Sequence, residues 1–345
     1  MIYFVYLLVM SILLFIERTD KNIRRLCRVL IPILYALFIG LRGKSNGVDT
    51  YTYYEHYYTY GRWGCDFVEP GFDWINRLCF SMGWEANSLF LAMAGVTCLF
   101  LYLSLEKLNN KDYTVSAFFI YLFTFPFLVN GMRQGVAVAV FFYAYRFIID
   151  RNWLSYVISI LFASLFHASA LLLLPIYLLN QYRLSRNLYT IIYLLSFLGI
   201  FIDISSYLPE IELGNRDYSN YATEVDMQSA SSLGFIVTTL LNVVVFYLIQ
   251  KNKLYNKIPL LFNFVLIDFC LKNLGFSIPI IGRMTIYFSW FIFLLYPNII
   301  FSCKNYLFNN RMITITLILF IYVSIWLNSL FTTGNKLLPY HFFWE

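Results

Sequence analysis

Long apolar segments alternate with short polar segments along almost the whole chain. The apolar segments fall near residues 2–16, 26–41, 86–104, 113–130, 132–149, 154–180, 187–203, 232–249, 258–273, 284–301 and 311–330. A helix needs about 20 predominantly apolar residues to cross the hydrocarbon core of a bilayer. The pattern therefore predicts an all-α, polytopic integral membrane protein with about 11 to 12 membrane helices in a single transmembrane domain, residues 1–345.

The composition supports this class. The 345 residues are 60% hydrophobic, 21% aromatic and only 13% charged, which does not describe a soluble chain. The net charge of +6 is modest, and we assign it to cytoplasmic anchoring residues rather than to nucleic-acid binding. The cysteines lack a zinc-binding spacing and the outer loops lack a DxD-like acidic cluster, so we expect no metal and no other cofactor.

Basic residues predict how the chain is oriented in the membrane. The densest basic cluster follows the first apolar segment and consists of Arg18, Lys21, Arg24, Arg25 and Arg28. The positive-inside rule makes this connection cytoplasmic, so the N-terminus is outside. Alternation then places 42–85, 203–231 and 331–345 outside, and 181–187 and 251–257 inside.

The apolar segment 154–180 must turn back for this topology to hold. It is long for one crossing and contains His167 near its middle. A single crossing would place Arg183 and Arg186 outside and the acidic segment 203–231 inside, against the positive-inside rule. We therefore expect a broken or hairpin helix near His167, with this residue at the outer mouth.

The topology gathers chemistry-bearing residues on the outer side: Arg42, Asp49, Glu69, Arg133, His167, Arg283 and the C-terminal residues 331–345. An ionisable group at membrane depth costs a few kcal/mol. Arg133 lies between two apolar segments and therefore needs a water-filled cavity, a partner or an anionic ligand. The alternative is snorkelling to the interface, which suits Arg42 best because Arg42 simply follows a helix end.

Two motifs lie in the predicted outer loop 42–85. GVDTYTYYEHYYTY, residues 47–60, predicts an interfacial helix that Asp49 can cap, with Tyr53 and Tyr57 on one face. These tyrosines fit an aromatic belt, and they could also stack on sugar rings.

The second motif is EPGFDWIN, which begins at Glu69. It combines this carboxylate with a predicted Pro70–Gly71 turn and the aromatic residues Phe72 and Trp74. A carboxylate held in this way suits a general base or a hydroxyl-binding group, although an exposed turn glutamate is the commoner case.

Three further motifs carry Arg133, His167 and Arg283. NGMRQG, residues 130–135, begins a helix whose backbone N–H groups could face the same anion as Arg133, and pyrophosphate is a natural guest. Arg283 precedes an apolar segment in a similar way, which suggests a two-point anion clamp. His167 in FHASAL is a candidate donor, base or phosphate ligand, although a lone histidine in an apolar helix is more often a packing residue.

These motifs, in this order, resemble the EpsG family of polysaccharide polymerases, which are related to the Wzy-type O-antigen polymerases. NGMRQG followed by FHASAL is the most specific pair. The resemblance implies that polyprenyl-diphosphate-linked oligosaccharide repeats are joined on the outer face of the bacterial cytoplasmic membrane, for O-antigen of lipopolysaccharide, capsule or exopolysaccharide. The implied partners are a lipid-linked donor and acceptor and membrane lipids, with a chain-length regulator as a candidate and no nucleic acid.

The implied reaction assigns roles to particular residues. The candidate residues that bind the diphosphate group are Arg133, Arg283, Gln134 and Arg42. The candidate catalytic bases are His167, Asp49 and Glu69. The candidate sugar-binding residues are Tyr53, Tyr57 and Trp74.

Three alternatives stay open. A flippase or transporter of lipid-linked oligosaccharides would share many helices, a central cavity and buried arginines. The others are a glycosyltransferase that uses a polyprenyl-monophosphate sugar and a ligase that moves finished glycan, which is close in chemistry. Transporter sites usually lie near the membrane midplane, often between inverted repeats. Here the charged motifs cluster at one face and no internal repeat is evident, which favours the enzyme.

Overall fold

Helices make up the regular structure of the chain, as predicted. The computed structural model describes residues 2–65, 67–201, 232–276, 279–302 and 311–345, and every regular element in these ranges is helical. The described chain divides into two compact units, residues 1–180 with 326–345 and residues 181–325. The predicted outer loop 203–231 lies outside the described residues.

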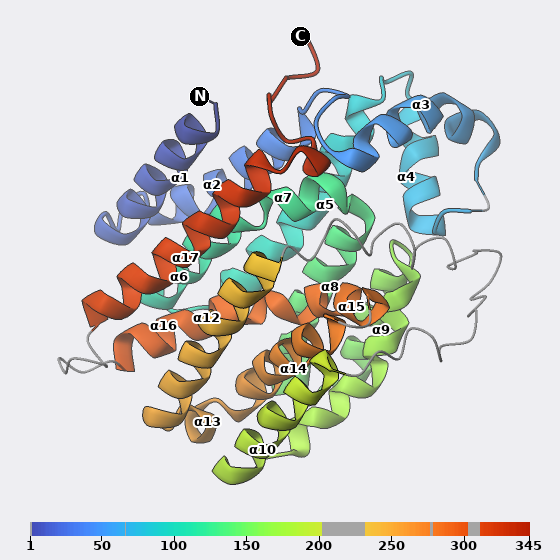
Figure 1. The fold of residues 1–345 in the computed structure, drawn as a ribbon. Helices are drawn as coiled ribbons and strands as arrows, with labels where there is room; N and C mark the ends of the chain where they lie inside the picture. Colours follow the sequence, from blue (N-terminus) through green and yellow to red (C-terminus); the bar gives the residue numbers. More distant parts are fainter. Residues whose placement is uncertain (1, 66, 202–231, 277–278, 303–310) are drawn as a thin grey trace. The chain divides into compact units, whose positions relative to one another are not determined.

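The first unit is built around α5. Its helices are α1 (Ile2–Thr19), α2 (Arg24–Gly40), α3 (Val48–Trp63), α4 (Pro70–Ser81), α5 (Asn87–Leu105), α6 (Asn110–Phe123), α7 (Phe125–Asn130), α8 (Met132–Ile149), α9 (Trp153–Ser164), the 3₁₀ helices η1 (Ala168–Gln181) and η3 (Thr333–Asn335), and the end of α17 (Arg311–Phe331) (Figure 1). Helix α5 packs against α2 on one side and α8 on another, and α8 continues the layer to α9. Helices α3 and α4 form a pair of their own.

The second unit is built around α14. Its helices are α10 (Arg186–Ser196), the 3₁₀ helix η2 (Phe197–Ile200), α12 (Ser232–Lys251), α13 (Leu254–Lys257), α14 (Pro259–Gly275), α15 (Pro279–Ser289), α16 (Phe291–Ser302) and most of α17. Helix α14 contacts α10, η2, α15 and α16.

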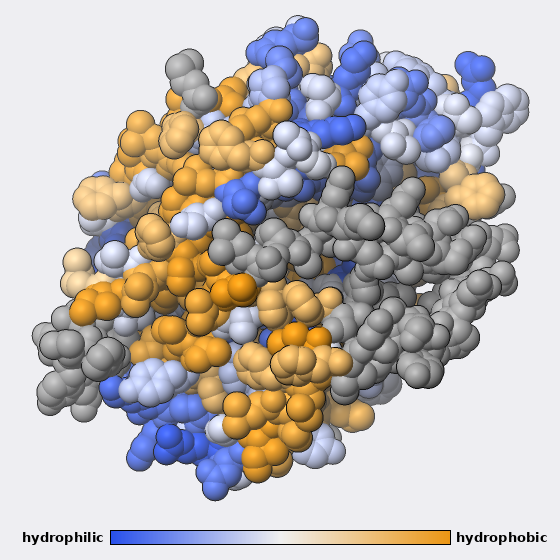
Figure 2. Space-filling model, in the orientation of Figure 1, coloured by the Kyte–Doolittle hydropathy of each residue, from blue (hydrophilic) through white to orange (hydrophobic). Residues whose placement is uncertain are grey.

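The described helices include several that are long and apolar enough to cross a bilayer, so the chain is a multi-pass membrane protein. Five helices are long and apolar enough by themselves: α1, α5, α8, residues 234–251 of α12, and α17. A sixth is the pair 281–289 and 291–302, bent by 50° at its break. Figure 2 shows many apolar side chains on outward faces of the helices, whereas the visible surface over α3 and α4 is mostly hydrophilic or neutral.

The five or six spans in the described residues are fewer than the 11 to 12 helices predicted from hydropathy. The physical reason is that several apolar segments are broken into pieces too short to cross alone. The segment 113–130 divides at Thr124, two residues before Pro126, and the segment 154–180 divides between Ser164 and Ala168. Hydropathy averages over such breaks and does not detect them.

The predicted hairpin at His167 is present. Helix α9 ends at Ser164, and the 3₁₀ helix η1 begins at Ala168. The Tyr156 hydroxyl donates to the Leu173 carbonyl at 2.6 Å, and its ring lies 5.4 Å from that of Tyr177. Residues before and after the break therefore lie side by side, and His167 sits at the turn.

The C-terminal segment packs on the loop that follows α2. Backbone bonds join the Gly43 N–H to the His341 carbonyl at 2.8 Å and the Phe343 N–H to the Leu41 carbonyl at 3.1 Å. The buried Asn46 side chain donates to the Pro339 carbonyl at 2.9 Å and accepts from the His341 N–H at 2.9 Å. Two segments that the topology placed on one side, the start of 42–85 and the tail 331–345, are thus in direct contact.

The membrane orientation can be tested by cysteine labelling in a cysteine-free variant. We expect Thr59→Cys, exposed on α3, to react with a membrane-impermeant maleimide on intact cells, and Leu184→Cys to react only after permeabilisation. Labelling of position 184 from outside would remove the topological argument for the hairpin.

Candidate functional site

Two side chains and one backbone N–H of the first unit meet the carboxylate of Glu69, and Tyr53 joins this cluster through Arg133. Nη1 of Arg133 donates to Oε2 of Glu69, and Nε of Arg133 donates to the Tyr53 hydroxyl at 2.9 Å. Nδ1 of His167 lies 3.5 Å from Oε1 of Glu69, and the Ala168 N–H lies at the same distance from that oxygen. The side chains of Glu69, Arg133 and His167 are 5%, 20% and 27% exposed, so the carboxylate is buried beneath two partly accessible partners.

Local structure explains why Glu69 meets His167. Glu69 is the N-cap residue of α4, and Pro70 is the first residue of the helix, a position where its missing N–H costs nothing. The Gly71 N–H donates to the Leu165 carbonyl at 2.8 Å, and a Cβ on Gly71 would lie 2.8 Å from that same oxygen. Glycine therefore lets α4 dock against the end of α9. The predicted turn at 70–71 is instead the first turn of a helix.

Arg133 reaches the cluster because α8 begins where predicted, at Met132. Its guanidinium lies 5.7 Å from the ring centroids of both Tyr53 and Phe72, within the range of cation–π attraction. In the described part of the chain, the structure gives partners to two of its N–H groups. A guanidinium has five N–H donors, so Arg133 keeps donors for a further acceptor.

The start of α3 corrects the predicted role of Asp49 as a helix cap. The helix begins at Val48, whose N–H donates to Oδ1 of Asn130 at 2.7 Å, while Gly47 occupies the N-cap position. Gly47 has a φ of 97°, and a Cβ there would lie 3.0 Å from Oδ1 of Asn130. The first asparagine of the NGMRQG motif therefore caps α3, and Asp49 is exposed in the first helical turn.

The environment of Glu69 keeps it ionised. Burial by itself raises the pKa of Glu69, but the adjoining His167 and the positive charge of Arg133 lower it more, to about 2. An ionised carboxylate only accepts hydrogen bonds, and Nδ1 of His167 is the ring nitrogen that faces it. A proton on Nδ1 would leave the lone pair on Nε2 as a proton acceptor.

Arg42 is 1% exposed, and its guanidinium is surrounded by groups of the first unit. It donates to Oγ1 of Thr50 at 2.9 Å and to the carbonyls of Ile39 at 2.8 Å and Val129 at 3.3 Å, and it lies 4.5 Å from the Phe90 ring centroid. Burial lowers the pKa of Arg42 to about 10, so it stays charged at neutral pH. Arg42 joins the ends of α2 and α7 to α3, and its role in binding the diphosphate stays a prediction.

The other predicted binding residues differ in accessibility. Tyr57 is fully buried and donates to the Trp84 carbonyl at 2.8 Å, so it packs α3 on α4 rather than facing a ligand. Trp74 is 64% exposed on α4, and Gln134 follows Arg133 on α8 and is partly buried.

Arg283 belongs to the second unit. It lies inside α15, not before a long apolar helix as predicted, and its side chain is exposed. The two-point clamp formed by Arg133 and Arg283 stays a prediction.

The sequence analysis missed a polar centre in the second unit. Asp268 is fully buried, its Oδ2 lies 2.6 Å from Nζ of Lys272, and its Oδ1 accepts from the Ser289 hydroxyl at 2.7 Å. Ser289 is the last residue of α15, directly before the bend. The signal was present: an acidic residue inside the apolar segment 258–273, followed four positions later by a lysine.

The fold and the cluster place the chain in the class of multi-pass helical membrane proteins that hold a buried carboxylate between an arginine and a histidine. The chain belongs to the EpsG family, whose model matches residues 24–342, and it is therefore a membrane protein linked to exopolysaccharide biosynthesis. No curated protein and no solved structure matches the chain.

Proposed function

We propose that this protein is a polymerase that joins polyprenyl-diphosphate-linked oligosaccharide repeats. The observation that carries the proposal is the convergence of Arg133, Glu69 and His167, which come from three separate motifs. Family membership supports the same reading, because all three motifs lie within the matched residues.

The reaction has two electrostatic requirements, and the cluster can meet both. A hydroxyl of the acceptor repeat attacks the anomeric carbon of the donor, forming a C–O bond, while the bond from that carbon to the diphosphate oxygen breaks. Negative charge develops on the departing polyprenyl diphosphate, where the remaining N–H donors of Arg133 would stabilise it. The hydroxyl proton passes to Nε2 of His167.

Glu69 suits a positioning role better than that of the base. A carboxyl group with a pKa of about 2 is a weak proton acceptor at neutral pH, since an effective base has a pKa closer to the working pH. Its two oxygens instead orient Arg133 and His167 at the same time. Asp49 stays a candidate base and can be tested beside His167.

A deletion strain tests the proposal and separates the alternatives. We expect its surface to carry single repeats instead of long chains, and plasmid-borne wild-type protein to restore long chains. Lipid-linked repeats that accumulate inside the cell would indicate a flippase. Long chains that remain on the carrier lipid would indicate a ligase. Either result would reject the polymerase.

A further inference from the structure

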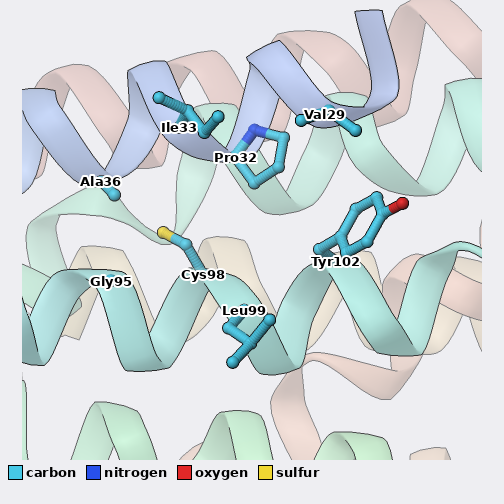
Figure 3. A pocket seen from close by; sticks show the side chains of 8 residues that line it. All are labelled: Val29, Pro32, Ile33, Ala36, Gly95, Cys98, Leu99 and Tyr102. Carbon is cyan, nitrogen blue, oxygen red and sulfur yellow. The ribbon is translucent and has the colours of Figure 1, made fainter. Parts of the chain in front are cut away.

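A groove lies between α2 and α5 in the first unit, with a volume of about 340 Å³. Its lining residues are Val29, Pro32, Ile33, Ala36, Gly95, Cys98, Leu99 and Tyr102 (Figure 3). The lining is almost wholly apolar, and the volume falls in the range of small-molecule pockets. Ala36 and Gly95 lie at one end of the groove, and Val29 and Tyr102 lie at the other.

Missing side-chain volume creates this groove. Beyond the end of the groove at Ala36 and Gly95, α2 and α5 approach closely: a Cβ on Gly40 would lie 2.6 Å from Cα of Leu91. At Gly95 the opposite holds, since no heavy atom lies within 4 Å of the position of a Cβ. The two helices therefore pack closely at Gly40, and the missing side chain of Gly95 leaves open space between them further along α5.

The groove is open at the apolar surface of the first unit. Ile33 and Leu99 in its wall are 48% and 52% exposed, and α5 is one of the candidate membrane spans. An exposed apolar groove on a membrane span is accessible to hydrocarbon chains from the side, without passage through water.

The end of the groove at Ala36 and Gly95 is the end nearer, along α2, to Arg42 and the cluster of Glu69, Arg133 and His167. From Ala36, α2 continues for four residues to Gly40, a rise of about 6 Å, and Arg42 follows two residues later. Arg42 contacts the Val129 carbonyl and Sδ of Met132, immediately before Arg133. An amphiphile with its anionic head at Arg133 could therefore lay its chain along α2 and α5.

We propose that this groove holds the isoprene units nearest the diphosphate of the polyprenyl substrate. The inference rests on the proposed function, which supplies a substrate of this class. A polyprenyl diphosphate has one hydrocarbon chain attached to its anionic head, which matches one groove near one cationic cluster. A phospholipid has two acyl chains on glycerol and matches this arrangement less well.

Gly95→Phe tests the proposal, because a Cβ at this position would meet no heavy atom within 4 Å and the ring would occupy space in the groove. Replacing a helical glycine also favours the helix, so we expect normal abundance. The purified protein in nanodiscs is irradiated with a polyprenyl diphosphate that carries a diazirine near its head. We expect labelled peptides from 29–36 and 95–102, and about tenfold weaker labelling in the variant, the change expected when about two CH₂ groups lose their burial.

The matched control is Val9→Phe, which adds a ring to the exposed face of α1 and should leave labelling unchanged. Gly95→Leu should give an intermediate loss. Labelling outside the groove, or equal labelling in Gly95→Phe and wild type, would overturn the proposal. So would labelling of the groove by a diazirine phosphatidylglycerol that excess polyprenyl diphosphate does not displace.

This assay needs no glycan transfer, so it separates the two proposals. Groove labelling in a protein that fails to make long chains would reject the polymerase and keep the lipid site. Normal labelling of Gly95→Phe, together with loss of polymer in Arg133→Ala, would reject the lipid site and keep the polymerase.

Discussion

Arg133→Ala should abolish long glycan chains in cells that lack the chromosomal copy. The substitution removes the guanidinium that we place against the leaving diphosphate, and loss of one preorganised electrostatic donor typically lowers a rate by about 10²–10³. Glycan length on gels and polymer formation by purified protein measure the effect. Arg133→Lys should recover only part of the activity, because an ammonium lacks the planar fork that contacts Tyr53 and Glu69 together.

A double variant separates this chemistry from simple stabilisation. Arg133→Ala removes the arginine partner of the buried Glu69 carboxylate, and breaking a buried ion pair can cost about 3–5 kcal/mol of stability. Glu69→Gln with Arg133→Gln removes both charges and keeps amides of similar size, so we expect near-normal abundance without polymer. Long chains from this double variant would show that the ion pair is structural only.

The sequence predicted the neighbourhood of this site through topology. The positive-inside rule placed Glu69, Arg133 and His167 on one side, and the structure brings them into contact. The rule uses charged residues as indicators of the membrane face that each connection occupies, and the orientation itself stays a prediction. It carries no information about distances, so it could not show that Arg133 pairs with Glu69.

The docking contacts that assemble the site were not predictable from residue types alone. Asn130 caps α3 from 82 positions away along the chain, and the Gly71 N–H donates a hydrogen bond to the Leu165 carbonyl. Local rules favoured Asp49 as the cap and a turn at Pro70–Gly71, because they consider only neighbours in sequence. Tertiary contacts supplied the partners instead, and they also decided that Tyr57 is buried.

His167→Gln should lower polymer formation by about 10²–10⁴, the usual contribution of a general base, at normal protein abundance. Glutamine keeps a hydrogen-bonding side chain beside Glu69 but cannot take the acceptor's proton near neutral pH. Polymer formation by purified protein measures the loss. Wild-type chain lengths from this variant would reassign the base, with Asp49→Asn as the next variant to test.

The pH profile separates the base from the residue that positions it. Because its pKa is lowered from 4.5 to about 2, Glu69 contributes stability that is present above pH 4.5 and is lost only as the pH falls through about 2. The carboxylate therefore does not titrate between pH 5 and 8, and an acid limb in that range must come from another group. If Glu69 only positions its neighbours, Glu69→Gln should therefore keep partial activity and retain the acid limb seen in the wild type between pH 5 and 8. Loss of that limb in Glu69→Gln would show that the carboxylate itself carries the proton transfer.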